Sequence, residues 1–191
     1  MSEGSDARRV LEARAQALAR PRATAREAHA GRTIYATFER GGVVYAIDPA
    51  FVVRAAHVLE PTALPRAPGH WRGVTSLHGE LLAVFDLPRL LGDDAPPLPE
   101  GVVEGDARGD PEPARVLVLV LGAVRAELAI VVDAVGEARA LADALALTPP
   151  TDGTTARLVL GTTPDGVRIL LADALLGDPR LRIEATTTSE A

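Results

Sequence analysis

The sequence of 191 residues contains no cysteine, no lysine and no asparagine. Without cysteine the chain can form no disulfide, no thiolate nucleophile and no cysteine-ligated metal site. Without lysine it lacks the lysine of a phosphate-binding loop, a Schiff-base nucleophile and a lysine general base. Without asparagine it has no N-glycosylation site. These absences exclude several classes of enzyme before any motif is considered.

Aromatic residues are also scarce, at 3% of the chain, although 47% of the residues are hydrophobic. This content is enough to bury a core, which must be built mainly of valine, leucine, isoleucine and alanine. The apolar runs are too short to span a membrane, and residues 1–20 lack the apolar stretch of a signal peptide. A net charge of −6 argues against binding to nucleic acid or to an anionic membrane. We therefore expect a soluble cytoplasmic protein without membrane insertion.

Residues 1–32 are expected to form an N-terminal extension made of a helix and a linker. Residues 6–20 have the composition of a helix that is capped by Ser5 or Asp6 and ended by Pro21. Its apolar stripe is thin, consisting of Leu11, Ala15 and Leu18 at helical spacing. This helix is interpreted either as a solvated extension or as a docking helix for a partner groove.

The folded domain is expected over residues 33–183, followed by a disordered tail at 184–191. Within it, residues 93–114 hold seven acidic residues and one arginine among several prolines and glycines. A segment of this composition cannot bury enough apolar surface to offset its ordering entropy. We predict an exposed, mobile acidic loop that is dispensable for folding.

Short strands separated by turn signals fill the rest of the domain. Alternating patterns predict strands at 33–39 and 43–48, and a hairpin over 73–87 that turns at Gly79. Asp48-Pro49 predicts a short helix through about Ala56, and residues 88–92 predict a helical turn ended by Gly92. Further strand signals are found at 115–122, 125–136, 156–166 and 167–177.

The two halves of the domain resemble each other. YAIDPAFV (45–52) is similar to LAIVVDAV (128–135), and LLGD occurs at both 90–93 and 175–178. The offsets of 83 and 85 residues indicate an internal duplication of a β-rich unit that is too small to be stable alone. Many short strands with turns between them are typical of barrels. We predict two barrels related by a pseudo-twofold axis, one built mainly from each half.

The polar residues do not match any known catalytic or metal-binding pattern. Ser76, His78 and Asp86 could in principle form a hydrolytic triad, but the G-x-S-x-G elbow is absent. His57, His70 and His78 do not have metal-ligand spacing, and no dinucleotide-binding glycine motif follows a strand. We predict no catalytic, cofactor-binding or metal site. A small hydrolase that uses Ser76 and His78 is the alternative from another class.

The stretch from Tyr45 to Gly92 resembles the CheW-like family of chemotaxis coupling proteins. The family pattern is a strand of the form G-V-x-N-L-R-G, a turn, and a strand of the form V-x-P-V-x-D-L. The matching residues here are Gly73, Val74, Leu77, Gly79, Val84, Asp86 and Leu87. In the second half, residues 116–137 are similar to the strand, turn, strand and V-V-D-x-V segment of the family.

This resemblance covers residues 33–177 and implies both a fold and a function. The fold would be mainly β, with two small intertwined five-stranded SH3-like barrels joined by short helices. The function would be a non-catalytic adaptor between the cytoplasmic tips of chemoreceptors and the regulatory domain of a CheA-type histidine kinase, at receptor arrays near the inner membrane. The resemblance places partner-binding residues at Val52, Ala55, Ala56, Arg72, His78, Gly79, Val132, Asp133 and Val135. Val52 and Val135 occupy equivalent positions in the two halves, and we expect Ala55 and Ala56 one helical turn beyond Val52.

The chain departs from the family pattern at several positions. Ser76 stands in place of the asparagine, His78 in place of the arginine, and Ala83 in place of the frequent proline. Val53-Arg54 stands where a basic and then an acidic residue are common. Histidine cannot make the bidentate contacts of a guanidinium. The alternative within the adaptor class is therefore a coupler in a non-motility pathway, such as pilus or developmental control.

Overall fold

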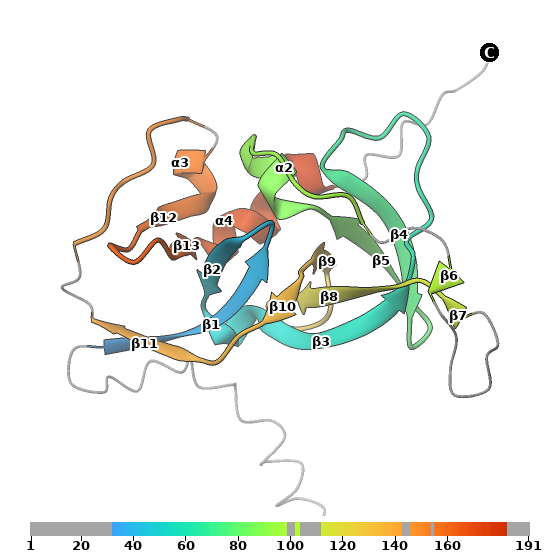
Figure 1. Cartoon of the computed structure of the whole chain (residues 1–191), viewed down its shortest axis with the longest axis horizontal. Helices are drawn as coiled ribbons and strands as arrows, with labels where there is room; N and C mark the ends of the chain where they lie inside the picture. Colours follow the sequence, from blue (N-terminus) through green and yellow to red (C-terminus); the bar gives the residue numbers. More distant parts are fainter. Residues whose placement is uncertain (1–31, 99–101, 104–111, 143–145, 154, 183–191) are drawn as a thin grey trace, which may run out of the picture.

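The computed structural model describes residues 32–98, 102–103, 112–142, 146–153 and 155–182. Strands predominate in these ranges, and the helices are short (Figure 1). The strands are β1 (Arg32–Arg40), β2 (Val43–Ile47), β3 (Val52–Leu59), β4 (Trp71–Leu77), β5 (Glu80–Phe85), β6 (Val102–Val103), β7 (Glu112–Pro113), β8 (Arg115–Leu121), β9 (Leu128–Val131), β10 (Ala134–Val135), β11 (Arg139–Ala142), β12 (Val159–Thr162) and β13 (Arg168–Leu170). The helical elements are η1 (Pro49–Phe51), α2 (Leu87–Leu91), α3 (Thr155–Leu158), α4 (Ala172–Gly177) and η2 (Pro179–Leu181). The prediction of a mainly β fold is confirmed, whereas the predicted helix at 6–20 and the tail at 184–191 lie outside the described residues.

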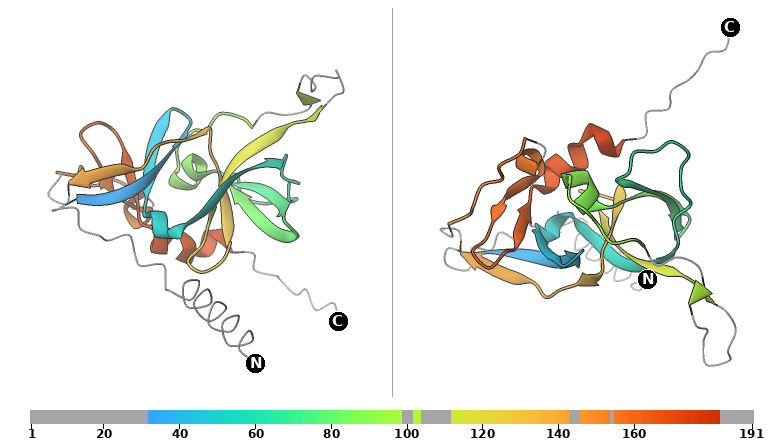
Figure 2. Two further views of the ribbon diagram at one scale, coloured as in Figure 1. Left: turned by 90° about the horizontal axis from the view of Figure 1, so that it is seen from below. Right: turned by 45° about the horizontal axis from the view of Figure 1, so that its top comes forward.

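The two main sheets form two units that lie side by side (Figure 1). One sheet has the strand order β10-β1-β2-β13-β12, with β11 also paired to β1, and the other has the order β3-β8-β9-β5-β4. Because β10 and β11 both pair with β1, they occupy the position that the single strand β3 holds beside β8. Figure 2 shows from two further directions that α2 and α4 lie between these units.

Each sheet takes strands from both halves of the chain, so the units are intertwined. Two parallel ladders make the exchange, one between β2 and β13 and the other between β5 and β9. Tyr45 lies opposite Arg168 in the first ladder, and Val84 lies opposite Ala129 in the second. Residue numbers in the two ladders are offset by 84, which agrees with the sequence repeat. The two units are therefore pseudo-symmetric, but neither is built from one half alone as the sequence had suggested.

Each sheet is closed toward a barrel by one isolated bridge. Thr62 exchanges two backbone hydrogen bonds with Val74, with N–O distances of 2.9 and 3.0 Å. Thr148 makes the equivalent pair of bonds to Thr162, at 2.8 and 2.9 Å. Beside the first bridge, Gly73 interrupts the β4–β5 register with a φ of +134°. A Cβ atom at Gly73 would lie 2.1 Å from the Thr62 carbonyl oxygen, so the closure of this barrel requires glycine.

The hydrophobic core has three parts. The largest cluster lies between the units and joins Phe38 and Tyr45 of one sheet to Phe85 and Ile130 of the other. A second cluster, with Val58, Val118 and Val131, fills the five-stranded unit, and a third, with Ala46 and Ile169, belongs to the six-stranded unit. The shared cluster means that separating the units would expose apolar surface on both.

The predicted helix from Pro49 to about Ala56 is wrong beyond its first turn. The Asp48 side chain does accept a hydrogen bond from the Ala50 backbone N–H at 2.9 Å, and Pro49 begins η1 as expected. The helix ends at Phe51, and β3 then pairs with β8 along its whole length. Ala55 and Ala56 consequently lie on opposite faces of a strand rather than on one helix.

The acidic segment 93–114 is partly described, and its described parts contact the domain. Arg168 pairs with the Asp93 carboxylate, Arg40 donates to the Pro96 carbonyl oxygen at 2.6 Å, and Leu98 packs against the core of the five-stranded unit. Further along, β6 and β7 pair with each other. Residues 99–101 and 104–111 lie outside the described residues, so the mobility of this segment stays a prediction.

Candidate functional site

Val52 and Val135 occupy matching positions in the two pseudo-symmetric units. Val52 lies opposite Leu121 in the β3–β8 ladder, and Val135 lies opposite Phe38 in the β10–β1 ladder. Both partner pairs are related by the same 83-residue offset. Val135 is 47% exposed, whereas Val52 is half-buried and packs against the shared core. Ala55 is exposed and Ala56 half-buried, so β3 presents small apolar side chains beside Val52.

His78 and Gly79 form the two-residue turn between β4 and β5. Their φ angles are +53° and +83°, which is the backbone of a type I′ hairpin turn. Leu77 and Glu80 pair across the base of the turn, and the turn itself is exposed. Leu81 is next to it and is 72% exposed. The turn is therefore a rigid projection of the five-stranded unit, separate from the surface at Val52 and Val135.

The remaining predicted site residues, Arg72, Val132 and Asp133, are committed to the interior. Val132 is 3% exposed and belongs to the shared core, so we leave it out of the proposed contact surface. Arg72 and Asp133 take part in a charge network with Arg40 and Asp86. The sequence analysis did not identify Arg40, although it falls on the same strand face as the core residue Phe38, two positions away.

Asp86 is the centre of this buried charge network. Its side chain is fully buried, and its backbone N–H donates to the His70 carbonyl oxygen at 2.8 Å. Arg40 binds both carboxylate oxygens of Asp86, with Nε–Oδ1 at 3.2 Å and Nη2–Oδ2 at 3.1 Å. Arg72 donates to Asp86 Oδ2 through Nε at 2.9 Å and Nη2 at 2.5 Å. Two guanidinium groups thus satisfy one carboxylate away from water.

Arg40 joins this carboxylate to the segment between β9 and β10. Its Nη1 donates to Asp133 Oδ1 at 2.6 Å, and Asp133 Oδ2 accepts the Gly41 backbone N–H at 2.7 Å. Burial alone would lower the pKa of Arg40, but hydrogen bonds and charges from Asp86 and Asp133 raise it above its ordinary value. Arg40 therefore stays charged and fixes the two units relative to each other.

The hydrolytic triad considered from sequence is not formed. Asp86 is bound by Arg40 and Arg72 rather than by His78, and Ser76 is exposed on β4. A carboxylate held by two guanidinium groups cannot orient an imidazole as the third member of a triad must. Of the candidate metal ligands, His70 lies near the Arg180 carbonyl oxygen at 3.3 Å. In the described ranges no group of three or more potential ligands is placed to hold a metal ion.

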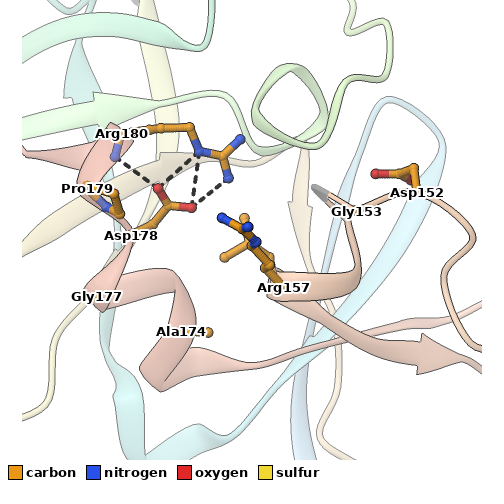
Figure 3. A pocket seen from close by; sticks show the side chains of 9 residues that line it. Asp152, Gly153, Arg157, Ala174, Gly177, Asp178, Pro179 and Arg180 are labelled. Carbon is orange, nitrogen blue, oxygen red and sulfur yellow. Dashed lines mark hydrogen bonds and ion pairs between the residues drawn. The ribbon is translucent and has the colours of Figure 1, made fainter.

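Two open hollows lie on the six-stranded unit and its helices. One, of about 580 Å³, is lined by Arg157, Leu158 and the Asp178–Arg180 segment (Figure 3). In it, Asp178 accepts hydrogen bonds from the Arg180 backbone N–H at 2.9 Å and from its guanidinium group, so these two charges neutralise each other. The other hollow, of about 450 Å³, is lined by β1, β13, η1 and α4.

The Arg180 backbone carbonyl ties the end of the domain to β4. It accepts a hydrogen bond from Trp71 Nε1 at 3.0 Å, and Arg180 Nη1 donates to the Leu90 carbonyl oxygen at 3.3 Å. Within the described ranges, no helix is both long enough and apolar enough to cross a membrane.

Comparison with known proteins agrees with this geometry. A paired, pseudo-symmetric β fold with exposed apolar strand surfaces and a core of buried ion pairs is that of a scaffolding domain. The structure is similar to the crystal structure of scaffolding protein TtCheW from Thermoanaerobacter tengcongensis, with 18% sequence identity and a TM-score of 0.55. The match covers 73% of this chain and 89% of that one. At this identity the likeness shows the fold.

The sequence match identifies the family. The CheW-like domain family matches residues 35–179, which is most of the chain. The chain therefore belongs to the CheW-like family, and the resemblance recognised at residues 45–92 is confirmed. No curated protein is matched by the sequence.

Proposed function

We propose that this chain is an adaptor that couples chemoreceptors to a CheA-type histidine kinase. The observation that carries the proposal is the CheW-like match over residues 35–179, which extends across both intertwined units. Family membership supports a coupling role, and we place this role in the cytoplasm, where the kinase and the receptor tips would meet.

Two exposed features of the structure support separate contacts for two partners. The apolar surface of Val52, Ala55 and Val135 suits the packing of a helical receptor tip, because a helix docks through apolar anchors. The rigid His78-Gly79 turn is a second projection, at the tip of the β4–β5 hairpin. We propose the first as the receptor contact and the second as part of the kinase contact.

The experiment measures binding of the purified chain to a receptor-tip fragment and to the regulatory domain of a kinase from the same genome, by isothermal titration calorimetry. Val135→Glu should abolish receptor-tip binding, because a carboxylate would be desolvated in the apolar contact. It should leave the melting temperature unchanged, because Val135 is 47% exposed.

The matched control is Val124→Glu, which introduces the same charge at a residue that is 93% exposed in the β8–β9 connection. It should bind both partners as the unmodified chain does. The coupling proposal would be overturned if the unmodified chain bound neither partner. It would lose its assigned receptor surface if Val135→Glu bound as well as Val124→Glu.

A deletion strain decides which pathway the adaptor serves. Loss of swimming chemotaxis would place it in a motility pathway. Intact chemotaxis with altered pilus function or development would place it in the alternative pathway, in keeping with His78 at the position of the family arginine.

A further inference from the structure

The 450 Å³ hollow of the six-stranded unit is an apolar groove with an acidic rim. Its apolar lining includes Ile34, Phe51, Leu160 and Leu171, and Leu160 is 48% exposed. Asp48 and Asp173 are the charged residues of the lining, and no arginine lines it. A ligand that fits this groove must therefore offer apolar side chains flanked by positive charge.

The chain itself contains a segment with this character. Residues 6–20 have the pattern of an amphipathic helix whose stripe is Leu11, Ala15 and Leu18. Arg14 falls beside that stripe, because it is three residues after Leu11 and four before Leu18. The stripe is too thin to form a core of its own, but two or three such side chains match a hollow of this size.

The segment is also tethered at the groove. The described chain begins at Arg32, and Thr33, the next residue, lines the groove. Residues 21–32 lie between the amphipathic segment and β1, and twelve residues reach up to about 40 Å when extended. A helix of fifteen residues is about 22 Å long, so this linker is long enough to let it fold back. Tethering gives the segment a high effective concentration at this groove compared with any free partner.

We propose that residues 6–20 dock in this groove as an intramolecular helix, with Leu11 and Leu18 against Leu160 and Arg14 near Asp48 or Asp173. The groove ends at Phe51, which immediately precedes Val52. The docked helix would border the surface that we assign to the receptor, but the docking itself does not depend on that assignment.

The absence of cysteine allows a direct test in the full chain, because an engineered pair would contain its only two thiols. The variant with Leu18→Cys and Leu160→Cys should form an intrachain disulfide under mild oxidation. The control carries Ala13→Cys and Leu160→Cys, since Ala13 falls on the opposite helix face from the stripe. Docking should make the first disulfide form at least about tenfold faster than the control, because the thiols are held together. Rates are measured by mass spectrometry of the alkylated products.

Equal rates for the two pairs would show a tethered segment that does not dock, and would overturn the proposal. A disulfide that forms mainly between chains would also overturn it, by showing that a second copy occupies the groove.

Hydrogen exchange gives an independent readout without cysteine. Replacing Leu11 and Leu18 by aspartate should accelerate exchange at 33–35 and 169–174, while replacing Ala13 and Gln16 by aspartate should not, although the added charge is the same. Identical exchange in both variants and the unmodified chain would contradict docking.

Discussion

Arg40 is a charged side chain where the pattern of its strand calls for an apolar one. It follows Phe38 on the buried face of β1, and only 2% of its side chain is exposed. Its position is tolerated because Asp86, Asp133 and the Pro96 carbonyl oxygen accept its hydrogen bonds. Removing one partner of such a set leaves a buried charge without compensation.

Arg40→Met should therefore reduce the free energy of unfolding by roughly 3–5 kcal/mol. The matched control is Arg139→Ala, which removes the pair with Asp165, where both side chains are about half exposed. That change should cost at most about 1 kcal/mol, because exposed pairs contribute little. Urea unfolding measures both, and similar losses in the two variants would contradict the role of the buried network.

Asp178 should make the stability depend on pH in the acid range. Hydrogen bonds from Arg180 hold the pKa of this buried carboxyl below its ordinary value, although burial acts in the opposite direction. A lowered pKa in the folded state means that the stabilisation is complete above the unfolded pKa, about 3.9, and is lost as the pH falls toward the folded pKa.

We expect Asp178→Asn to lose about 1 kcal/mol at pH 7, since Arg180 is partly exposed and its pairing is screened by solvent. The difference from the unmodified chain should shrink below about pH 4 as Asp178 itself becomes protonated. Unfolding by urea at a series of pH values measures it. A difference that stays constant down to pH 2.5 would show that the effect is not electrostatic.

At the residue scale, the sequence indicated part of this chemistry but not its use. Asp86, Arg72 and Asp133 were noticed, the first as a family residue and the others as partner contacts. Their convergence depends on β1, the β9–β10 segment and the end of β5 meeting between the units, which no local pattern reveals. Arg40 alone carried a local signal, because it continues the apolar face of β1.

At the scale of elements, hairpins were predictable where the turn is local. The β4–β5 hairpin follows from strand alternation around Gly79, and α2 ends at Gly92 as predicted, with a φ of +88°. The start of η1 was also predicted from Asp48 and Pro49, but its length was not. The β-branched pair Val52-Val53 favours extended backbone, and the decisive partner, β8, is more than sixty residues away in the chain.

The glycine at the β4 bulge gives a test of how the five-stranded unit closes. Gly73→Ala should cost roughly 3 kcal/mol, because its Cβ would collide with the Thr62 carbonyl oxygen and its φ is positive. Gly79→Ala is the control, since its φ is also positive but no atom lies within 4 Å of the added Cβ.

The control should cost only about 1–2 kcal/mol, which is the price of the backbone conformation alone. Thermal and urea unfolding of the two variants measure the difference. Equal losses would mean that the Thr62–Val74 bridge yields without cost and does not close the barrel.

At the scale of the whole molecule, the intertwining predicts how fragments behave. A chain divided between residues 103 and 104 gives two fragments, and each lacks strands that both sheets require. Neither fragment alone should unfold cooperatively, because each would leave the shared core exposed. Mixed together they should recover a cooperative transition, measured by circular dichroism, at a rate that rises with concentration. A cooperative transition in either fragment alone would contradict the intertwined topology.

The repeat in the sequence predicted two related units, but it could not predict the exchange of strands between them. Similar residues at an offset of 83–85 are compatible with two separate barrels and with two that share strands. The choice is made by the parallel β2–β13 and β5–β9 ladders, whose contacts are non-local. Hydrophobic patterning marks these strands as buried without saying which neighbour each will find.

Sharing strands in both directions has a mechanical consequence for an adaptor. Rotation of one unit against the other would have to break ladder hydrogen bonds in both sheets and separate Arg40 from Asp86, so the molecule has no soft axis between its units. In the proposed role it would act as a stiff strut rather than as a hinge. A displacement applied at one partner's contact would reach the other partner with its direction preserved, and the spacing between receptor and kinase would be set by the fold itself.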